Sequence, residues 1–142
     1  MTDVHEGKGS CLCGAVKMLF KSISSEVGAC HCGMCQKWTG GPLLVVDCGT
    51  DVLFEGRENI SVYKSSEWAE RAFCNKCGSH LYYRLLEPNQ YIMPVGLFDT
   101  DIPLVFDHQI FIDSKPSYYH FGNKTKEMTG EEVFAQYAPP ES

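Results

Sequence analysis

Seven of the chain's eight cysteines fall into three short clusters, and these clusters constrain the fold more than any other feature of the sequence. The clusters are a pair, a triad and a second pair: Cys11 and Cys13, then Cys30, Cys32 and Cys35, then Cys74 and Cys77. Such spacings are typical of zinc sites. Gly14, Gly33 and Gly78 follow or interrupt the clusters. They let the backbone turn tightly enough for neighbouring sulfurs to face one metal ion.

Composition narrows the class of protein. The 142 residues suit a single zinc-binding domain, 1–142, which is long enough to bury a core without disulfides. A formal net charge of −6 argues against nucleic acid or an anionic membrane as partner, and no apolar run is long enough to span a membrane. The N-terminal residues, 1–6, are polar and acidic and lack the features of a signal peptide. We therefore expect a cytoplasmic protein, whose thiols are used for metal binding rather than disulfides.

Short apolar segments separated by turn residues predict a mainly β fold. The expected strands span 15–20, 42–47, 52–54, 60–63, 80–86, 91–95 and 105–112. The cysteine clusters are expected in loops at 7–14, 30–41 and 74–78, with one helical turn near 34–38. Pro94 should place its strand at a sheet edge or end it early. Thr129 and Glu132 have the spacing of a capping box, which predicts a short C-terminal helix through Tyr137.

The number of sulfurs suggests how the clusters divide. The two pairs together supply four ligands, enough for a closed site: Cys11, Cys13, Cys74 and Cys77. The triad supplies three and leaves one position of a tetrahedral metal open. Closed zinc sites are structural, whereas catalytic sites keep an open position. We therefore predict a structural zinc that staples residue 11 to residue 77. The triad should hold a second, reactive zinc or act as a cluster of activated thiols.

Other interpretations of the cysteines stay open at this stage. The even count would also suit a disulfide framework, although pairs separated by one residue bridge poorly. Cys32 and Cys35 have redox-motif spacing, but no βαβ pattern surrounds them. The second zinc could also be structural, with His31 or another group as the fourth ligand. Cys48 is expected to be a small buried apolar residue, and His80 an ordinary strand residue.

The segments 9–14, 30–37 and 71–81 resemble the glutathione-dependent formaldehyde-activating enzyme family in the order and spacing of all seven cysteines. The resemblance covers roughly residues 7–112. It implies a β-rich zinc domain built from small layered β-sheets, with two metal sites. The structural zinc would be held by Cys11, Cys13, Cys74 and Cys77. The catalytic zinc would be held by Cys30, Cys32 and Cys35.

The resemblance also implies an activity. We expect a carbon–sulfur lyase that adds a small-molecule thiol, glutathione or a related one, reversibly to a small aldehyde such as formaldehyde. An open zinc position can accept a thiol and lower its pKa. Three thiolates leave the site negatively charged, so we expect thiol activation rather than polarisation of the aldehyde, with Cys32 as the central ligand. The alternatives are a non-catalytic zinc-binding module with structural zinc only, and a thiol/zinc redox sensor.

Overall fold

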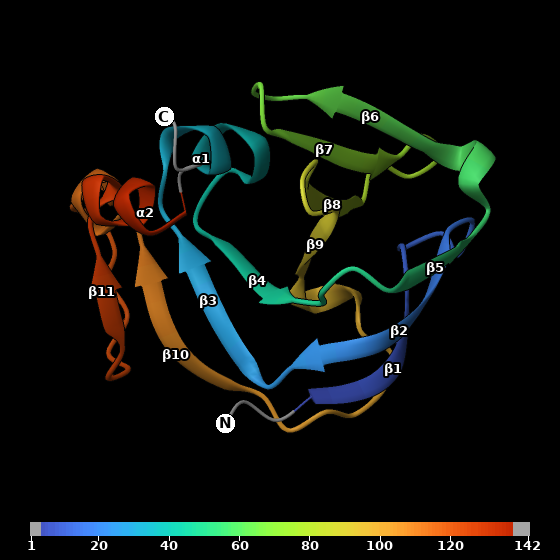
Figure 1. Cartoon of the computed structure of the whole chain (residues 1–142), viewed down its shortest axis with the longest axis horizontal. Coiled ribbons are helices and arrows are strands. Elements are labelled where there is room, and N and C mark those ends of the chain that lie inside the picture. The colour runs from blue at the N-terminus through green and yellow to red at the C-terminus, as the bar shows by residue number, and fades with distance from the viewer. Residues whose placement is uncertain (1–3, 138–142) are drawn as a thin grey trace. The chain divides into compact units, whose positions relative to one another are not determined.

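Figure 1 shows the computed structural model of the chain, which describes residues 4–137. The fold is mainly β, with strands in two sheets and a short C-terminal helix, as the sequence predicted. The described chain divides into two compact units. The first unit contains residues 4–25 and 46–104, and the second contains 26–45 and 105–137. No helix within 4–137 is both long enough and apolar enough to cross a membrane.

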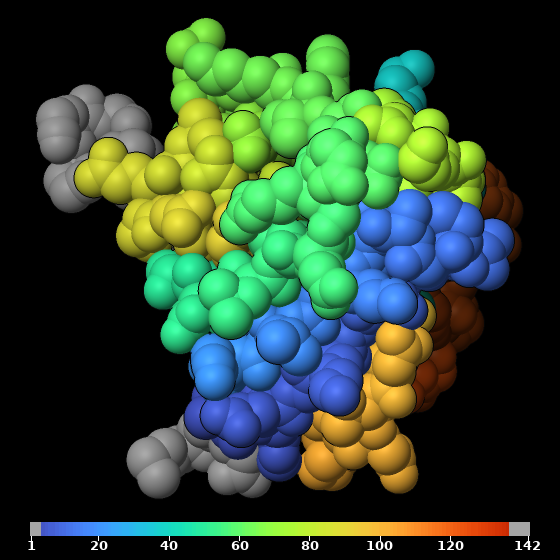
Figure 2. Space-filling view, turned by 90° about the vertical axis from the view of Figure 1, so that its right-hand side faces the viewer, coloured from blue at the N-terminus to red at the C-terminus, as the bar shows by residue number. Residues whose placement is uncertain are grey.

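The first unit contains an antiparallel three-stranded sheet in the order β1–β2–β5. Its strands are β1 (Val4–Ser10), β2 (Lys17–Ser24) and β5 (Val52–Glu55). Along β2, Met18 and Phe20 are buried while Leu19 between them is exposed. This alternation is expected of a sheet that covers a core with one face. Figure 2 shows the surface over these strands, with the blue of β1 and β2 beside the green of β5.

The first unit also contains four antiparallel strands in the order β9–β8–β7–β6. They are β6 (Ile60–Lys64), β7 (Ala69–Cys74), β8 (His80–Leu85) and β9 (Gln90–Pro94). Two 3-10 helices flank this group, η1 (Arg57–Asn59) and η2 (Val95–Leu97). The third cysteine cluster begins at Cys74, the last residue of β7, and continues into the turn before β8. The strand β9 ends at Pro94, which is the early end that was one of the two expectations for this proline.

The second unit is built around β10, which lies between β3 and β11 and pairs in parallel with both (Figure 1). Its elements are β3 (Glu26–Cys30), α1 (Gly33–Thr39), β10 (Val105–Ile110), η3 (Ile112–Ser114), β11 (Lys126–Met128) and α2 (Gly130–Tyr137). The strand β4 (Leu43–Asp47) carries the chain from this unit back to the first. The predicted capping box opens α2. The Thr129 amide donates to Glu132 Oε1 at 2.8 Å, and the Glu132 amide donates to Thr129 Oγ1 at 3.2 Å.

Some sequence predictions need correction. The loop expected over 7–14 begins only at Cys11, because residues up to Ser10 belong to β1, and β3 was not expected at all. Each of these strands contains a glycine that permits a close contact. A Cβ on Gly9 would lie 2.8 Å from the Leu97 carbonyl oxygen. One on Gly28 would overlap the His108 ring. These strand glycines therefore permit close approach and do not form turns.

Two further boundaries differ from the expected ones. The strand expected over 105–112 ends at Ile110, because Phe111 has a left-handed backbone with φ of 55°. Residues 69–74, where no strand was expected, form the full strand β7. The three-residue strand β11 was not expected either.

Candidate metal centres

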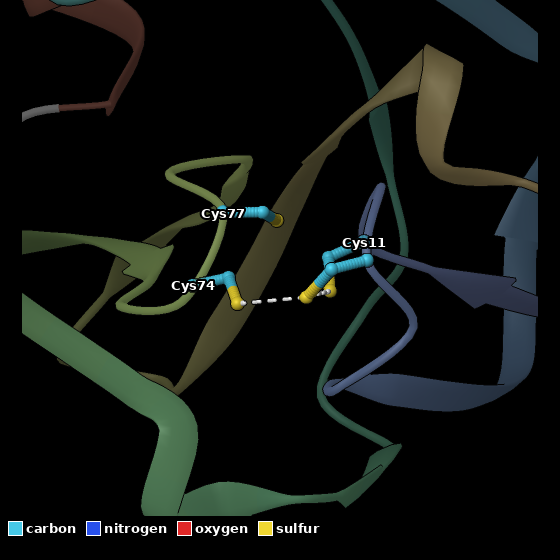
Figure 3. Close-up of side chains that lie close together, drawn as sticks. Cys11, Cys74 and Cys77 are labelled. Atoms are coloured by element: carbon cyan, nitrogen blue, oxygen red, sulfur yellow. Dashed lines mark hydrogen bonds between the residues drawn. The ribbon is translucent and has the colours of Figure 1, made fainter.

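Two loops of the first unit bring four cysteines together (Figure 3). We call Cys11, Cys13, Cys74 and Cys77 the four-cysteine site, and their sulfurs all lie within 4.8 Å of one another. The Cys11 and Cys13 sulfurs are 3.7 Å apart, and those of Cys13 and Cys74 are 3.8 Å apart. A tetrahedral zinc with bonds of about 2.3 Å needs sulfurs about 3.7 Å apart. The geometry and the ligand type therefore fit zinc.

Backbone amides point at these sulfurs because each loop turns sharply. The Val16 amide donates to Cys11 Sγ and the Lys76 amide donates to Cys74 Sγ, each at 3.4 Å. The glycine that follows each cysteine pair has φ of 81°, a left-handed conformation that strongly favours glycine. Hydrogen bonds to sulfur stabilise the thiolate over the thiol. These amides thus favour the form of cysteine that binds metal. At Cys13 the Ala15 backbone hydrogen bond acts in the same direction, but desolvation and the neighbouring sulfurs outweigh it and raise the pKa to about 11.

Ser79 is a member of this site that the sequence reasoning missed. Its hydroxyl lies 3.2 Å from Cys77 Sγ and accepts a hydrogen bond from the Leu12 amide at 3.0 Å, so it joins the two loops. The hydroxyl and amide of Ser79 lower the pKa of Cys77 to about 5. Cys77 is therefore ready to act as a thiolate. Only the position of Ser79 directly after Cys77-Gly78 could have drawn attention to it.

The second unit brings together Cys30, Cys32 and Cys35, which we call the cysteine triad. Their sulfurs also lie within 4.8 Å of one another. Cys30 ends β3, Cys32 is the N-cap of α1, and Cys35 lies in the first turn of that helix. The Cys35 amide donates to Cys32 Sγ at 3.4 Å. Cys30 and Cys35 are buried, whereas Cys32 is partly exposed.

The electrostatics of the triad favour a bound cation. The pKa of Cys30 is raised far above its ordinary value by the neighbouring sulfurs of Cys32 and Cys35 and by burial. The three sulfurs therefore resist ionising together unless a positive charge lies among them. Thiolates in such a group select thiophilic metals such as zinc. The donor set of the triad thus fits a metal ion.

His31 does not complete the triad. It is fully buried, and both of its ring nitrogens are already hydrogen-bonded. Nδ1 lies 2.7 Å from the Tyr119 hydroxyl, and Nε2 lies 2.8 Å from Gln109 Oε1. Neither nitrogen is left to bind a metal, which argues against a closed second site with His31 as fourth ligand.

The remaining candidates lie apart from both groups. Cys48 is fully buried, its thiol faces the Val46 carbonyl oxygen at 3.8 Å, and burial raises its pKa. His80 is the first residue of β8 and pairs with Phe73 across the sheet. Its pKa is lowered by burial and by the nearby Arg71. Both behave as the sequence predicted, Cys48 as an apolar residue and His80 as a strand residue.

Comparison with known proteins is consistent with this geometry. A family model described as glutathione-dependent formaldehyde-activating enzyme matches residues 6–114. A Schizosaccharomyces pombe protein named as an uncharacterised lyase is 36% identical over 129 residues, which cover 90% of this chain and 94% of that protein. A crystal structure of a Rhodobacter sphaeroides protein aligns with a TM-score of 0.58 at 24% identity. That alignment covers 68% of this chain and 91% of the other, and it shows a likeness of fold.

Proposed function

This chain belongs to the glutathione-dependent formaldehyde-activating enzyme family, and from that membership we propose that it is a zinc-dependent carbon–sulfur lyase. Its reaction would be the reversible addition of a thiol, glutathione or a related one, to a small aldehyde such as formaldehyde. A sulfur–carbon bond forms, the carbonyl π bond breaks, and the thiol proton ends on the carbonyl oxygen. The observation that carries the proposal is the cysteine triad, which gathers three sulfurs within 4.8 Å.

The four-cysteine site would be the structural zinc site. Its two loops are far apart in sequence. Cys13 and Cys74, whose sulfurs are in contact, are 61 residues apart along the chain. The loop amides and the Ser79 hydroxyl are directed at the sulfurs. A metal ion there would fix the turn after β1 against the turn after β7, and the whole first unit would depend on it.

The triad would be the reactive site. Zinc bound there would supply a cation with an open position, at which the pKa of a substrate thiol is lowered. Cys30 and Cys35, both buried, would fix two of the ligand directions. Cys32, the most exposed of the three, would border the path by which substrate arrives. Because three thiolates outweigh the charge of one divalent cation, the site favours a nucleophilic sulfur over a polarised aldehyde.

The proposed partners are small molecules, a thiol and an aldehyde. We place the activity in the cytoplasm, because a reducing compartment keeps both the substrate thiol and the cysteine ligands free of disulfides.

The test is exchange between glutathione and formaldehyde, followed by exchange NMR at increasing protein concentration. We expect saturable acceleration by the wild-type chain and none by Cys32→Ser. Cys48→Ala is the matched control, because Cys48 is a cysteine outside both groups, and its activity should equal the wild type. A zinc-loaded chain that accelerates exchange for none of several thiols and aldehydes would contradict the proposal. In that case the protein would be a non-catalytic zinc module or, if mild oxidation releases the zinc, a redox sensor.

A further inference from the structure

His31 occupies an unusual place in the second unit. It lies between two members of the triad, Cys30 and Cys32, and its side chain is fully buried. Its backbone is fixed on both sides. The His31 amide donates to the Ile110 carbonyl oxygen at 3.1 Å, and the Gln36 side-chain amide donates to the His31 carbonyl oxygen at 2.7 Å. Movement of His31 would therefore displace both cysteines that flank it.

The ring of His31 is held as firmly as its backbone. Gln109 turns its amide nitrogen toward Thr125, to whose Oγ1 it donates at 2.9 Å, so Gln109 Oε1 faces the ring. His31 Nε2 therefore carries the hydrogen and donates to that oxygen. The other nitrogen, Nδ1, then accepts from the Tyr119 hydroxyl at 2.7 Å. Every polar group of His31 has a partner, which is what a polar side chain needs to be stable when buried.

Tyr119 is itself fixed in place. The Lys115 ammonium donates to the Pro116 carbonyl oxygen at 3.0 Å and to the Tyr119 carbonyl oxygen. The same ammonium lies 5.1 Å from the centre of the Tyr119 ring. The ring centres of Tyr119 and His31 are 5.6 Å apart. Tyr119 therefore meets His31 from a braced segment of the chain, and this segment lies beyond residues 6–114 that the family model matches.

We propose that Tyr119 is a positioning residue for the cysteine triad. Through His31 it holds the stretch from Cys30 to Cys32 in the backbone geometry that brings the three sulfurs together. It does not touch the reacting atoms. Its hydroxyl fills the one hydrogen-bonding position of the His31 ring that Gln109 leaves open. The inference rests on the proposed function in one respect, that the triad binds a metal ion.

The loss of a single hydroxyl tests the idea. Tyr119→Phe removes the donor to His31 and keeps the ring. Tyr118→Phe is the matched control, because Tyr118 is adjacent, 77% exposed and equally aromatic. Each variant keeps zinc in the four-cysteine site, and cobalt is titrated into the triad and followed by its thiolate charge-transfer absorption. Loss of a hydrogen bond that orients a ligand set costs about 10- to 100-fold in metal affinity.

We expect a loss of this size, with a changed cobalt spectrum, for Tyr119→Phe alone. Wild-type affinity and spectrum in Tyr119→Phe would overturn the proposal. So would an equal loss of metal at the four-cysteine site, because the hydroxyl would then support the fold in general and not the triad.

A second readout does not depend on metal in the triad. Cys30 is buried, so the rate of its alkylation by iodoacetamide reports how firmly the chain around it is held. With zinc in the four-cysteine site only, iodoacetamide should alkylate Cys30 faster in Tyr119→Phe than in the wild type or in Tyr118→Phe. If the wild-type triad takes up no cobalt at all, the metal in the proposed function is wrong, and these rates decide the positioning role. Equal alkylation rates in all three proteins would overturn it.

Discussion

The four-cysteine site and the cysteine triad use the same ligand atom but are built in opposite ways. The four-cysteine site joins two loops distant in sequence, and its sulfurs are met mainly by amides from those loops and by Ser79. The triad lies within residues 30–35, and its support comes from far away. The partners of the His31 ring, Gln109 and Tyr119, lie 78 and 88 residues after His31 in the chain.

The contrast suggests that the fold depends on the metal at one site, whereas metal binding depends on the fold at the other. At the four-cysteine site the ligands come from separate loops, so in our proposal the metal holds that part of the fold together. At the triad the sulfurs come from one short stretch, so in the same proposal the fold would hold them ready for a metal ion. Removing a cysteine should therefore damage structure in the first case and chemistry in the second.

The largest effect is expected from Cys74→Ser. Structural zinc sites contribute about 10–16 kcal/mol in small zinc domains, against a total stability of about 5–15 kcal/mol for a typical domain. The variant should lose its fold, which appears as collapsed dispersion in the amide NMR spectrum and loss of cooperative thermal unfolding. A well-folded Cys74→Ser chain would show that the two sites do not differ as we argue.

Cys32→Ser should give the opposite result. Because Cys32 is partly exposed and its partners lie in one stretch, we expect the variant to stay folded and to lose only the stability that the triad metal adds by binding. The exchange of glutathione with formaldehyde should fall to the uncatalysed rate. Circular dichroism and the exchange assay on the same sample check both parts. Full turnover in this variant would remove the triad from the catalytic role.

Ser79→Ala should weaken only the four-cysteine site. Its hydroxyl lowers the pKa of Cys77. Loss of a hydrogen bond that orients a metal ligand lowers metal affinity by about 10- to 100-fold, so zinc affinity should fall by that factor. Competition with a coloured chelator measures the affinity, and the triad in the same chain serves as the reference. Equal weakening of both sites would mean that Ser79 acts on the whole molecule. Tyr119→Phe should weaken only the triad and Ser79→Ala only the four-cysteine site. The two variants together would therefore show that each site has its own support.

The smallest effect is expected from Cys48→Ala. The side chain is fully buried and lies outside both groups, so the loss of its sulfur should cost about 1 kcal/mol of stability with no change in metal content. Thermal unfolding and metal analysis test this directly. Loss of one metal ion from Cys48→Ala would mean that the seven-cysteine assignment is incomplete.

The grouping of the cysteines could be predicted from sequence because it depends on short spacings and a count of ligands. The structure gathers the sulfurs into the same groups of four and three. The roles of the two groups stay predictions. The C-terminal helix was predictable for a similar local reason, since Thr129 and Glu132 cap it within three residues.

Features that depend on distant contacts could not be predicted. Gly9 indicates a loop when only its neighbours are considered, yet it permits a close approach by the distant residue Leu97. Gly28 likewise permits a close approach by His108. His31 looked like a possible ligand because it lies between two cysteines. Its actual partners come from β10 and from the segment beyond η3, and no local pattern reveals them.

The central claim is that the chain carries two metal sites that differ in their number of sulfurs. The most direct test is metal per chain, measured by mass spectrometry under non-denaturing conditions on protein purified without chelator. The account predicts two zinc ions in the wild type and one in Cys32→Ser, with the remaining ion at the four-cysteine site. One zinc ion in both proteins would contradict it, because the triad would then be a group of thiols without a metal.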